Sequence, residues 1–519
     1  MRITFLGHAG FCVETSKAVL IADPWLSPTG AFDAAWFQFP QNHHLAAYVQ
    51  EKLSDSRKER YVYISHEHKD HFDIPFLNSL ESRDFTFVLP KFRRDHLRSV
   101  LADYECKGMM VCPNDETFEI AGGTVTLFLD DSELNRDSSI LIKDDASAFL
   151  DMNDCRLYDA LPAIVRRHKR IDVFAAQFSG AGWHPTCYDY SRERYEAISR
   201  RKMMGKFRAV EQSIRLVRPR VFLPSAGPPC FLDPTLFHLN LERVNIFPRA
   251  SKLIGYLDET LRDLSTTWPE LMPGDVVDVA SARVAYQAKQ RVRAEEFADY
   301  VGDYAAAYDG FFGERRVQYA PEDVDKICLR LRDELAYKLD QLTLRTRVAV
   351  PLYFGLSDWP DRVLRVDFQE GRVEPASAIP DRDFYSISAP SWEVARLLDG
   401  KLTWDDFSLT FRMRLNRAPD VYQTILHGFL HLEPEDMNWF CAKVLNIEAN
   451  QERIVKECNG RRYVVDRYCP HQGGDLTHAW VDDDGLLTCP RHGWQFDLDR
   501  DGKSLNNLGT VNAVCLDDD

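Results

Sequence analysis

The chain has 519 residues, and its 64 Lys and Arg against 80 Asp and Glu give a formal net charge of −16 at pH 7. This length exceeds what one ordinary hydrophobic core holds, so we expect two or three domains. The acidic balance argues against nonspecific binding to nucleic acid or anionic lipid, which leaves small molecules or another protein as the expected partners.

The start of the chain and its cysteines bear on location. Met1 runs directly into Arg2-Ile3-Thr4-Phe5 without a charged and then apolar leader, and no run of about 18 consecutive apolar residues occurs. The 12 cysteines are scattered, which is typical of a reducing compartment with metal-bound and free thiols. We therefore expect a cytoplasmic protein without a membrane span.

The segment 1–245 alternates short apolar runs with turns and a few helices, a pattern that predicts a layered α/β domain. From Ser191 to Arg218, apolar residues recur mostly at helical spacing, so we expect one long helix there. The expected strands are 3–6, 18–21, 61–64, 87–89, 125–129, 139–142, 148–150, 171–174 and 221–223.

A metal-binding pattern follows one of these strands. His66-Glu67-His68-Lys69-Asp70-His71 comes directly after the apolar run that ends at Ser65. A loop at a strand end can aim its imidazoles and carboxylate at one point, where they can bind one or two metal ions. We take His66, His68, Asp70 and His71 as candidate catalytic and metal-binding residues. The alternative is a loop that has kept the pattern and lost the metal.

This run, together with Gly7-His8-Ala9-Gly10 and Asp23-Pro24-Trp25-Leu26, resembles the metallo-β-lactamase superfamily, which implies a four-layer αββα sandwich. The resemblance implies Asp154, at a strand end, as a further metal ligand. Glu133 and Asp137 fall where many members carry another histidine. A carboxylate in that place moves the preference of the site from zinc toward iron or manganese, and we include Glu133 among the metal ligands.

Four other residues of this segment are weaker candidates. His184 and His238 are possible extra ligands. His8 and Asp23 fit better as groups that orient the ligands than as ligands themselves.

The segment 246–440 predicts an α+β accessory domain without a metal or nucleotide motif. We expect helices at 282–300, 321–339, 391–398 and 421–432, and strands joined by turns within 346–373. His427 and His431 stand four residues apart, which could place both on one helix face. Without a nearby carboxylate or third ligand, we favour structural packing over metal binding for this pair.

The segment 441–519 predicts a small all-β domain with a metal cluster. Cys469-Pro470-His471 and Cys489-Pro490-Arg491-His492 present two Cys-His pairs. Two thiolates can bind one iron and two imidazoles the other, which is the ligation of a Rieske [2Fe-2S] centre. A zinc site built from Cys and His is the less favoured alternative. Such a cluster moves single electrons and must supply another reaction.

A cluster domain of this kind joined to a metallo-β-lactamase-like domain resembles the CMP-N-acetylneuraminate hydroxylase family. The likeness includes Asp23-Pro24-Trp25-Leu26, residues 63–71 and 178–182, the basic helix from Arg192, and residues 218–227. The order of parts differs, because the Rieske part comes first in the animal hydroxylases, and we assign no counterpart to the middle segment. We therefore take the type of chemistry from the resemblance and not the substrate.

The resemblance implies a hydroxylase with a [2Fe-2S] cluster and a mono- or dinuclear non-haem Fe site in the sandwich. An external donor, such as a reductase, a ferredoxin or a cytochrome b5-like protein, would reduce the cluster, and O2 would be activated at the iron. The two centres would have to face each other within a chain or between the subunits of a homo-oligomer. Gly474 and Arg491 stand where high-potential Rieske proteins carry a loop disulfide, which implies the lower-potential kind.

Three functions remain open. The leading hypothesis is an oxygenase that hydroxylates or N-oxidises a polar metabolite. The second is a metal-dependent hydrolase of the metallo-β-lactamase superfamily with a regulatory cluster. The third is an electron carrier whose sandwich docks a partner. The basic side chains of the helix from Arg192 could guide an anionic substrate, but we favour a solvated helix face.

Overall fold

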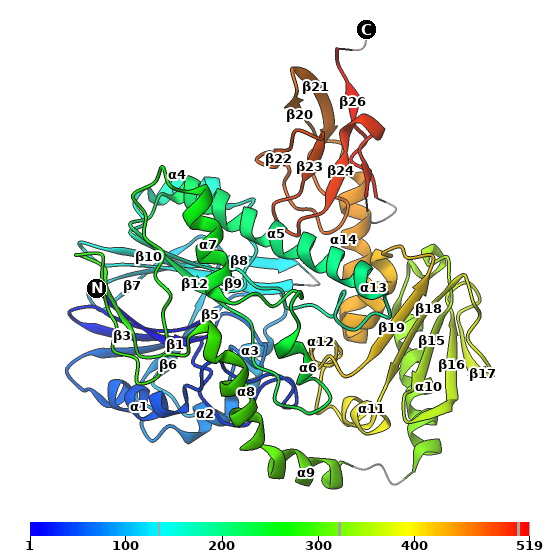
Figure 1. The fold of residues 1–519 in the computed structure, drawn as a ribbon, viewed down its shortest axis with the longest axis horizontal. Coiled ribbons are helices and arrows are strands. Elements are labelled where there is room, and N and C mark those ends of the chain that lie inside the picture. Colours follow the sequence, from blue (N-terminus) through cyan, green and yellow to red (C-terminus); the bar gives the residue numbers. More distant parts are fainter. Residues whose placement is uncertain (133–134, 320–322, 506–508, 518–519) are drawn as a thin grey trace.

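The computed structural model describes residues 1–132, 135–319, 323–505 and 509–517 (Figure 1). A two-sheet sandwich carries the N-terminal half, a smaller sheet lies to its right in the view, and the C-terminal domain stands above both. Within the described residues, no helix combines the length and apolar character needed to cross a membrane.

The first sheet of the sandwich is eight-stranded in the described part of the chain. Its order is β14-β13-β1-β2-β3-β4-β5-β6, and β3 to β6 run parallel to one another. The bounds are β1 Arg2–Gly7, β2 Gly10–Glu14, β3 Ala18–Ala22, β4 Glu59–Tyr63, β5 Thr86–Pro90, β6 Gly108–Cys112, β13 Val276–Asp278 and β14 Arg283–Ala285.

The second sheet is six-stranded and has the order β12-β11-β10-β9-β8-β7. Its strands are β7 Thr117–Ile120, β8 Gly123–Ser132, β9 Asn135–Lys143, β10 Ala148–Asp151, β11 Val173–Gln177 and β12 Val221–Ser225. Apolar side chains of both sheets, among them Phe11, Tyr63 and Phe149, form one core between them. Alternate residues of each strand thus face this core, and the others face the helices outside.

Helices cover the outer face of each sheet. The first sheet is packed by α1 (Ala46–Ser54), α2 (Ile74–Ser79) and α3 (His96–Val100). The second is packed by α4 (Leu161–His168), α5 (Arg192–Val217) and α7 (Ala250–Thr260). The layers therefore follow the order helix, sheet, sheet, helix, which confirms the predicted αββα sandwich with its metallo-β-lactamase-like fold.

The long helix α5 follows from its sequence. The Ser191 side chain accepts a hydrogen bond from the Arg194 backbone N–H and so caps the first turn. Arg218 has φ 49° and ψ 51°, a left-handed conformation that ends the helix. Between these ends Phe207, Val210 and Ile214 face the second sheet. The helix predicted from Ser191 to Arg218 is thereby confirmed.

The end of the sandwich differs from the pattern in the sequence. Strands β13 and β14 lie beyond residue 245 and still pair within the first sheet, so the sandwich chain continues past the predicted boundary. The helix predicted at 282–300 was wrong over its first half, because Arg283–Ala285 is strand β14 and a helical turn starts only at Ala294. Pairing with β13 outweighs the helical propensity of an alanine-rich stretch.

The middle region (residues 286–433) contains a five-stranded sheet of order β17-β16-β15-β18-β19. Its strands are β15 Leu352–Leu356, β16 Trp359–Asp367, β17 Arg372–Ala376, β18 Phe384–Ala389 and β19 Arg414–Ala418. Its helices are α8 Phe297–Ala306, α9 Asp309–Gln318, α10 Val324–Gln341, α11 Ser391–Leu398, α12 Trp404–Leu409 and α13 Thr424–His431, and α6 His238–Leu241 precedes it. One hydrophobic cluster joins Trp36 and Phe231 of the sandwich to Phe354 and Phe411, so the two regions share a core.

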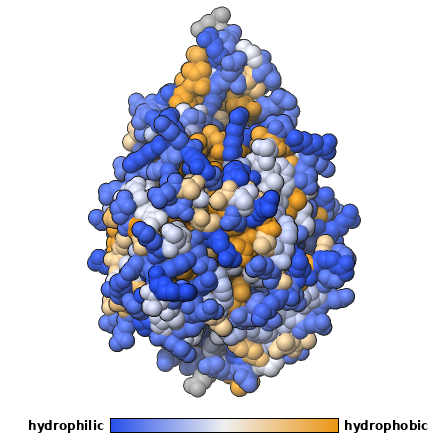
Figure 2. All heavy atoms as spheres, turned by 90° about the vertical axis from the view of Figure 1, so that its left-hand side faces the viewer, coloured by the Kyte–Doolittle hydropathy of each residue, from blue (hydrophilic) through white to orange (hydrophobic). Residues whose placement is uncertain are grey.

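The C-terminal domain starts with helix α14 (Met437–Ala449) and continues as two small sheets. The first contains β20 Arg453–Cys458, β21 Arg461–Asp466 and β26 Val514–Cys515, and the second β22 Trp480–Val481, β23 Leu486–Thr488, β24 Gln495–Asp497 and β25 Lys503–Ser504. Figure 2 shows a largely hydrophilic face of the molecule, with hydrophobic patches near the tip that this domain forms and across the middle of the view. Val455 and Val514 of its outer strands are exposed.

Candidate functional site

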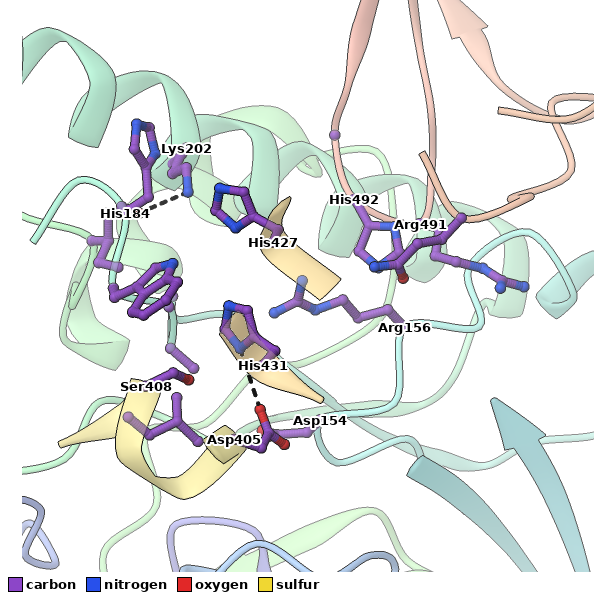
Figure 3. A pocket seen from close by; sticks show the side chains of 18 of the residues that line it. Asp154, Arg156, His184, Lys202, Asp405, Ser408, His427, His431, Arg491 and His492 are labelled. Atoms are coloured by element: carbon purple, nitrogen blue, oxygen red, sulfur yellow. Dashed lines mark hydrogen bonds and ion pairs between the residues drawn. The ribbon is translucent and has the colours of Figure 1, made fainter. Parts of the chain in front are cut away.

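One cavity of about 990 Å³ lies where the sandwich, the middle region and the C-terminal domain meet. His66 and Asp154 of the sandwich and His471 and His492 of the C-terminal domain line it, and Figure 3 shows Asp154 and His492 in it. The middle region contributes Asp405 and other side chains of α12 and α13. The two sets of predicted metal ligands therefore open into the same space.

The sandwich end of this cavity brings histidines and carboxylates together. The loop after β4 carries His66 and His71, and the loop after β10 carries Asp154. One donor atom from each of these three residues lies within 4.8 Å of the others, and His8, Asp70 and His71 form a second such group. Because His71 belongs to both groups, the geometry suits one metal ion or two adjacent ions.

Polar atoms without partners mark the place that a metal ion would take. Asp70 Oδ1, His71 Nε2 and Asp154 Oδ1 are buried and have no hydrogen-bond partner within the described part of the structure. Burying such atoms unsatisfied costs free energy, and a bound cation would remove that cost. A ligand set that combines imidazoles with carboxylates fits iron or manganese as well as zinc.

Asp23 fixes the orientation of His71. Its carboxylate accepts hydrogen bonds from the Ser65 backbone N–H at 2.8 Å, from the Ser65 hydroxyl at 2.6 Å, and from Nδ1 of His71 at 2.8 Å. Nε2 of His71 is thus left to face the metal position. His8, which we expected only to orient ligands, instead lies with Nε2 3.0 Å from Asp70 Oδ2, inside one of the two donor groups.

Other predicted ligands lie beside the two groups rather than in them. His68 is 2.7 Å from His66 through Nδ1, but its Nε2 lies 3.0 Å from Asp405 Oδ2. Burial lowers the pKa of His68, but the hydrogen bond to Asp405 and the charges of Asp405, Asp70 and Asp406 together outweigh burial and raise the pKa to about 9. Asp137 Oδ1 lies 3.2 Å from His66 Nδ1. Glu133 lies outside the described residues.

The two possible extra histidines are in different places. His184 lines the cavity and shares a hydrogen bond of 3.1 Å with the Tyr190 hydroxyl. His238 is the first residue of the short helix α6. Within the described part of the chain, neither belongs to a group of side chains that could hold a metal ion.

The second ligand set sits on two loops of the C-terminal domain. Cys469 and Cys489 are buried and free of disulfides, and a hydrogen bond from Cys469 lowers the pKa of Cys489. Nδ1 of His471 is buried without a hydrogen-bond partner, whereas Nε2 lies 3.2 Å from the Tyr422 hydroxyl. Burial, followed by the charge of Arg156, lowers the pKa of His471 to about 3, so its ring is neutral and its Nδ1 can bind iron. These residues fit a [2Fe-2S] cluster.

Residues 434–514 match the family model of the Rieske [2Fe-2S] domain. The C-terminal domain is a Rieske domain. The chain is 28% identical over 98% of its length, and 98% of the relative's, to a Mycobacterium tuberculosis protein named "Putative Rieske 2Fe-2S iron-sulfur protein". It is 21% identical to cytidine monophosphate-N-acetylneuraminic acid hydroxylase of Xenopus laevis over 88% of this chain and 76% of that one.

Among solved structures, this chain is similar to CmlA, a diiron β-hydroxylase from Streptomyces venezuelae. The similarity has a TM-score of 0.35 and 14% identity, and it covers 55% of this chain and 54% of CmlA. A metallo-β-lactamase fold protein, YhfI from Bacillus subtilis, gives a TM-score of 0.35 at 11% identity over 53% of this chain and 99% of its own.

Arg491 and the Asp475 backbone N–H, which donates to Asp159 Oδ2 at 3.0 Å, connect the Rieske domain to the sandwich. Arg491, between two cluster ligands, lies 2.9 Å from Asp159 Oδ2 and 3.5 Å from Asp130 Oδ1. A Cβ atom at Gly474 would lie 3.2 Å from Arg491 Cβ, so these two positions do face each other across the cluster loops as a disulfide pair would. The loops are held here by domain contacts instead.

The basic helix contributes to the cavity, contrary to our preference for a solvated face. Lys202 and Lys206 of α5 line the cavity together with Arg156 from the loop after β10. Arg200, Lys202 and Arg208 of the same helix are exposed, and Lys206 is half-buried. The helix thus presents cations on two faces, and one of those faces lies toward the candidate metal site. The periodicity of the sequence could not show which face would border a cavity.

Proposed function

We propose that this chain is a Rieske-dependent non-haem iron oxygenase that hydroxylates or N-oxidises a polar, anionic metabolite. The single observation that carries the proposal is the shared cavity, which both ligand sets line. A cluster in this position could pass its electrons to a metal ion at the sandwich end of the same cavity. Distant similarity to a hydroxylase is consistent with this assignment.

The chain's own residues divide the work between the two ends of the cavity. Cys469, His471, Cys489 and His492 would hold the cluster, and His66, His71 and Asp154, with His8 and Asp70 adjacent, would hold iron. The cluster would supply single electrons and the iron would supply the redox chemistry that activates O2. A reductase, a ferredoxin or a cytochrome b5-like protein would provide the electrons.

The charge of the cavity wall favours an anionic substrate. Lys202, Lys206 and Arg156 line the cavity, and Figure 3 shows Arg156 between Asp154 and His492 and Lys202 beside His184. A carboxylate or phosphate group bound by these cations would hold the rest of the molecule beside the metal position. The cavity volume of about 990 Å³ leaves room for a molecule of nucleotide or sugar-acid size.

A hydrolase with a regulatory cluster is the second candidate. Its support is the ligand set itself, because histidines and carboxylates on this fold also suit zinc-dependent hydrolysis. That function would use the sandwich end of the cavity alone. It gives no reason for the cluster histidines to line the same space.

Metal analysis and isotope labelling separate the two candidates. The full chain is prepared without oxygen, its iron and zinc are measured, and it is incubated with isotopically labelled O2, a chemical reductant and a mixture of nucleotides, sugar phosphates and sugar acids. We expect iron beyond the two atoms of the cluster and label in a product. Zinc in the sandwich and product formation without O2 would establish the hydrolase instead.

A further inference from the structure

The middle region places a tyrosine against a cluster ligand. The Tyr422 hydroxyl lies 3.2 Å from Nε2 of His471, the ring nitrogen on the far side from the unpartnered Nδ1. The Tyr422 ring also meets the Trp494 ring edge-on at 5.2 Å between centroids, and Trp494 in turn stacks on His471 at 4.2 Å. Tyr422 is thereby packed against the Rieske loops.

Two histidines of α13 extend the contacts from Tyr422 toward the sandwich. The rings of Tyr422 and His427 are stacked with their centroids 4.1 Å apart, and the rings of His427 and His431 are nearly parallel at 6.0 Å. The spacing of four residues places both imidazoles on one face of the helix. Figure 3 shows His431 below His427 and directed toward Asp405.

Asp405 of α12 joins this row of rings to the candidate metal site. Its Oδ1 lies 3.6 Å from Nδ1 of His431, and its Oδ2 lies 3.0 Å from Nε2 of His68. Nδ1 of His68 is in turn 2.7 Å from Nε2 of His66. From His471 to His66 the series is continuous, and its longest separation is the 6.0 Å between two ring centroids.

His427 is buried, and its Nε2 shares a hydrogen bond of 3.3 Å with the Tyr385 hydroxyl. That bond satisfies one ring nitrogen, while the ring itself stacks on Tyr422. Within the described residues, neither His427 nor His431 belongs to a group that could hold a metal ion. Their common property is that each contacts the next along one line between the two ligand sets.

We propose that Tyr422, His427, His431 and Asp405 form the route by which an electron passes within one chain from the cluster to iron at the sandwich site. This inference rests on the proposed function. An external one-electron donor reduces the cluster. The reduced cluster then loses one electron and a ferric ion at the sandwich site gains it and becomes ferrous, so no atom is transferred. Tunnelling decays steeply with the width of the gaps, and these contacts keep the gaps narrow.

The test measures the transfer step directly. The iron-loaded full chain, with the cluster oxidised and the sandwich iron ferric, receives one electron per cluster from a light-activated reductant without oxygen. The recovery of the cluster's visible absorbance then gives the rate at which the electron moves on. Tyr422→Phe removes only the hydroxyl that contacts His471, and Asp405→Asn weakens the contact to His68. Tyr256→Phe, whose hydroxyl bonds Glu211 away from the cavity, is the matched control.

We expect recovery in Tyr422→Phe and Asp405→Asn to be at least tenfold slower than in the unaltered chain, with the control unchanged. Iron content and the paramagnetic resonance spectrum of the reduced cluster verify that both centres are assembled in each variant. If the unaltered chain transfers its electron and both variants match its rate, the route is wrong and the oxygenase proposal stands. If the unaltered chain transfers none, both proposals fail.

Discussion

Arg491 and Asp159 form an ion pair of 2.9 Å between the Rieske domain and the sandwich, with the arginine side chain 14% exposed and the aspartate side chain 4% exposed. Replacing Arg491 by Ala leaves the Asp159 carboxylate buried without this cation, although it keeps the hydrogen bond from the Asp475 backbone N–H. Because a broken buried pair costs far more than an exposed one, we expect a loss of about 3–5 kcal/mol in the free energy of unfolding. Chemical unfolding followed by the cluster's absorbance measures this loss.

Arg167→Ala provides the comparison for that experiment. Arg167 pairs with Asp115 at the surface, where the loss should stay below about 1 kcal/mol. Equal effects of the two substitutions would show that Arg491 does not hold the Rieske domain in place.

The two metal positions should be separable by mutation. Cys469→Ser removes a cluster ligand, so we expect the cluster's absorbance to vanish while the sandwich metal remains. Asp154→Ala removes a carboxylate from the other group, so we expect the reverse. Metal content per chain and the visible spectrum check both variants. Loss of both centres in either variant would contradict two independent sites.

Asp23 should matter for metal affinity although it belongs to neither donor group. Its carboxylate holds Nδ1 of His71 and leaves Nε2 toward the metal position. We expect Asp23→Ala to weaken metal binding at the sandwich about 10- to 100-fold, as measured by competition with a chelator. Asp55→Ala, at an exposed ion pair with Arg57, should leave the affinity unchanged. An unchanged affinity in Asp23→Ala would remove Asp23 from the site.

Anion binding should weaken as the pH rises through neutrality. Desolvation within the cavity, then the charges of Arg156 and Arg417, lower the pKa of Lys202 to about 7. A lysine loses its charge above its pKa, so the attraction present at lower pH is lost as the pH increases. We expect affinity for inorganic sulfate, measured calorimetrically, to fall about fivefold between about pH 6 and about pH 8.

Lys202→Arg tests the origin of that dependence, because a guanidinium stays charged throughout this range. The variant should bind sulfate with little change over the same interval. A fall as steep as in the unaltered chain would mean that another group is responsible.

Local patterns in the sequence predicted most of the sandwich and both ligand motifs. The helix from Ser191 to Arg218 was set by its apolar spacing and its cap, and the loop from His66 to His71 was set by the strand before it. Both are encoded within a few residues. The strand at Arg283–Ala285 was missed because it depends on pairing with β13, which neighbouring residues do not reveal.

The contacts of His427 and His431 in the middle region could not be predicted from the sequence. His427 and His431 were favoured as packing residues because the sequence around them shows no recognisable metal motif. In the fold, Asp405 lies 3.6 Å from His431 after a separation of 26 residues, and Tyr422 stacks on His427. The spacing of four residues did indicate that the two imidazoles lie on the same face of a helix. The contact between Tyr422 and His471, which are 49 residues apart in the chain, depends on how the Rieske domain packs on the middle region.

The row of contacts from His471 to His66 also limits how this chain can be taken apart. A Rieske fragment expressed alone would keep its four ligands and lose the tyrosine that touches one of them. Exchanging that fragment for one from another protein would preserve a redox centre but would have to rebuild the contact between the Tyr422 hydroxyl and His471.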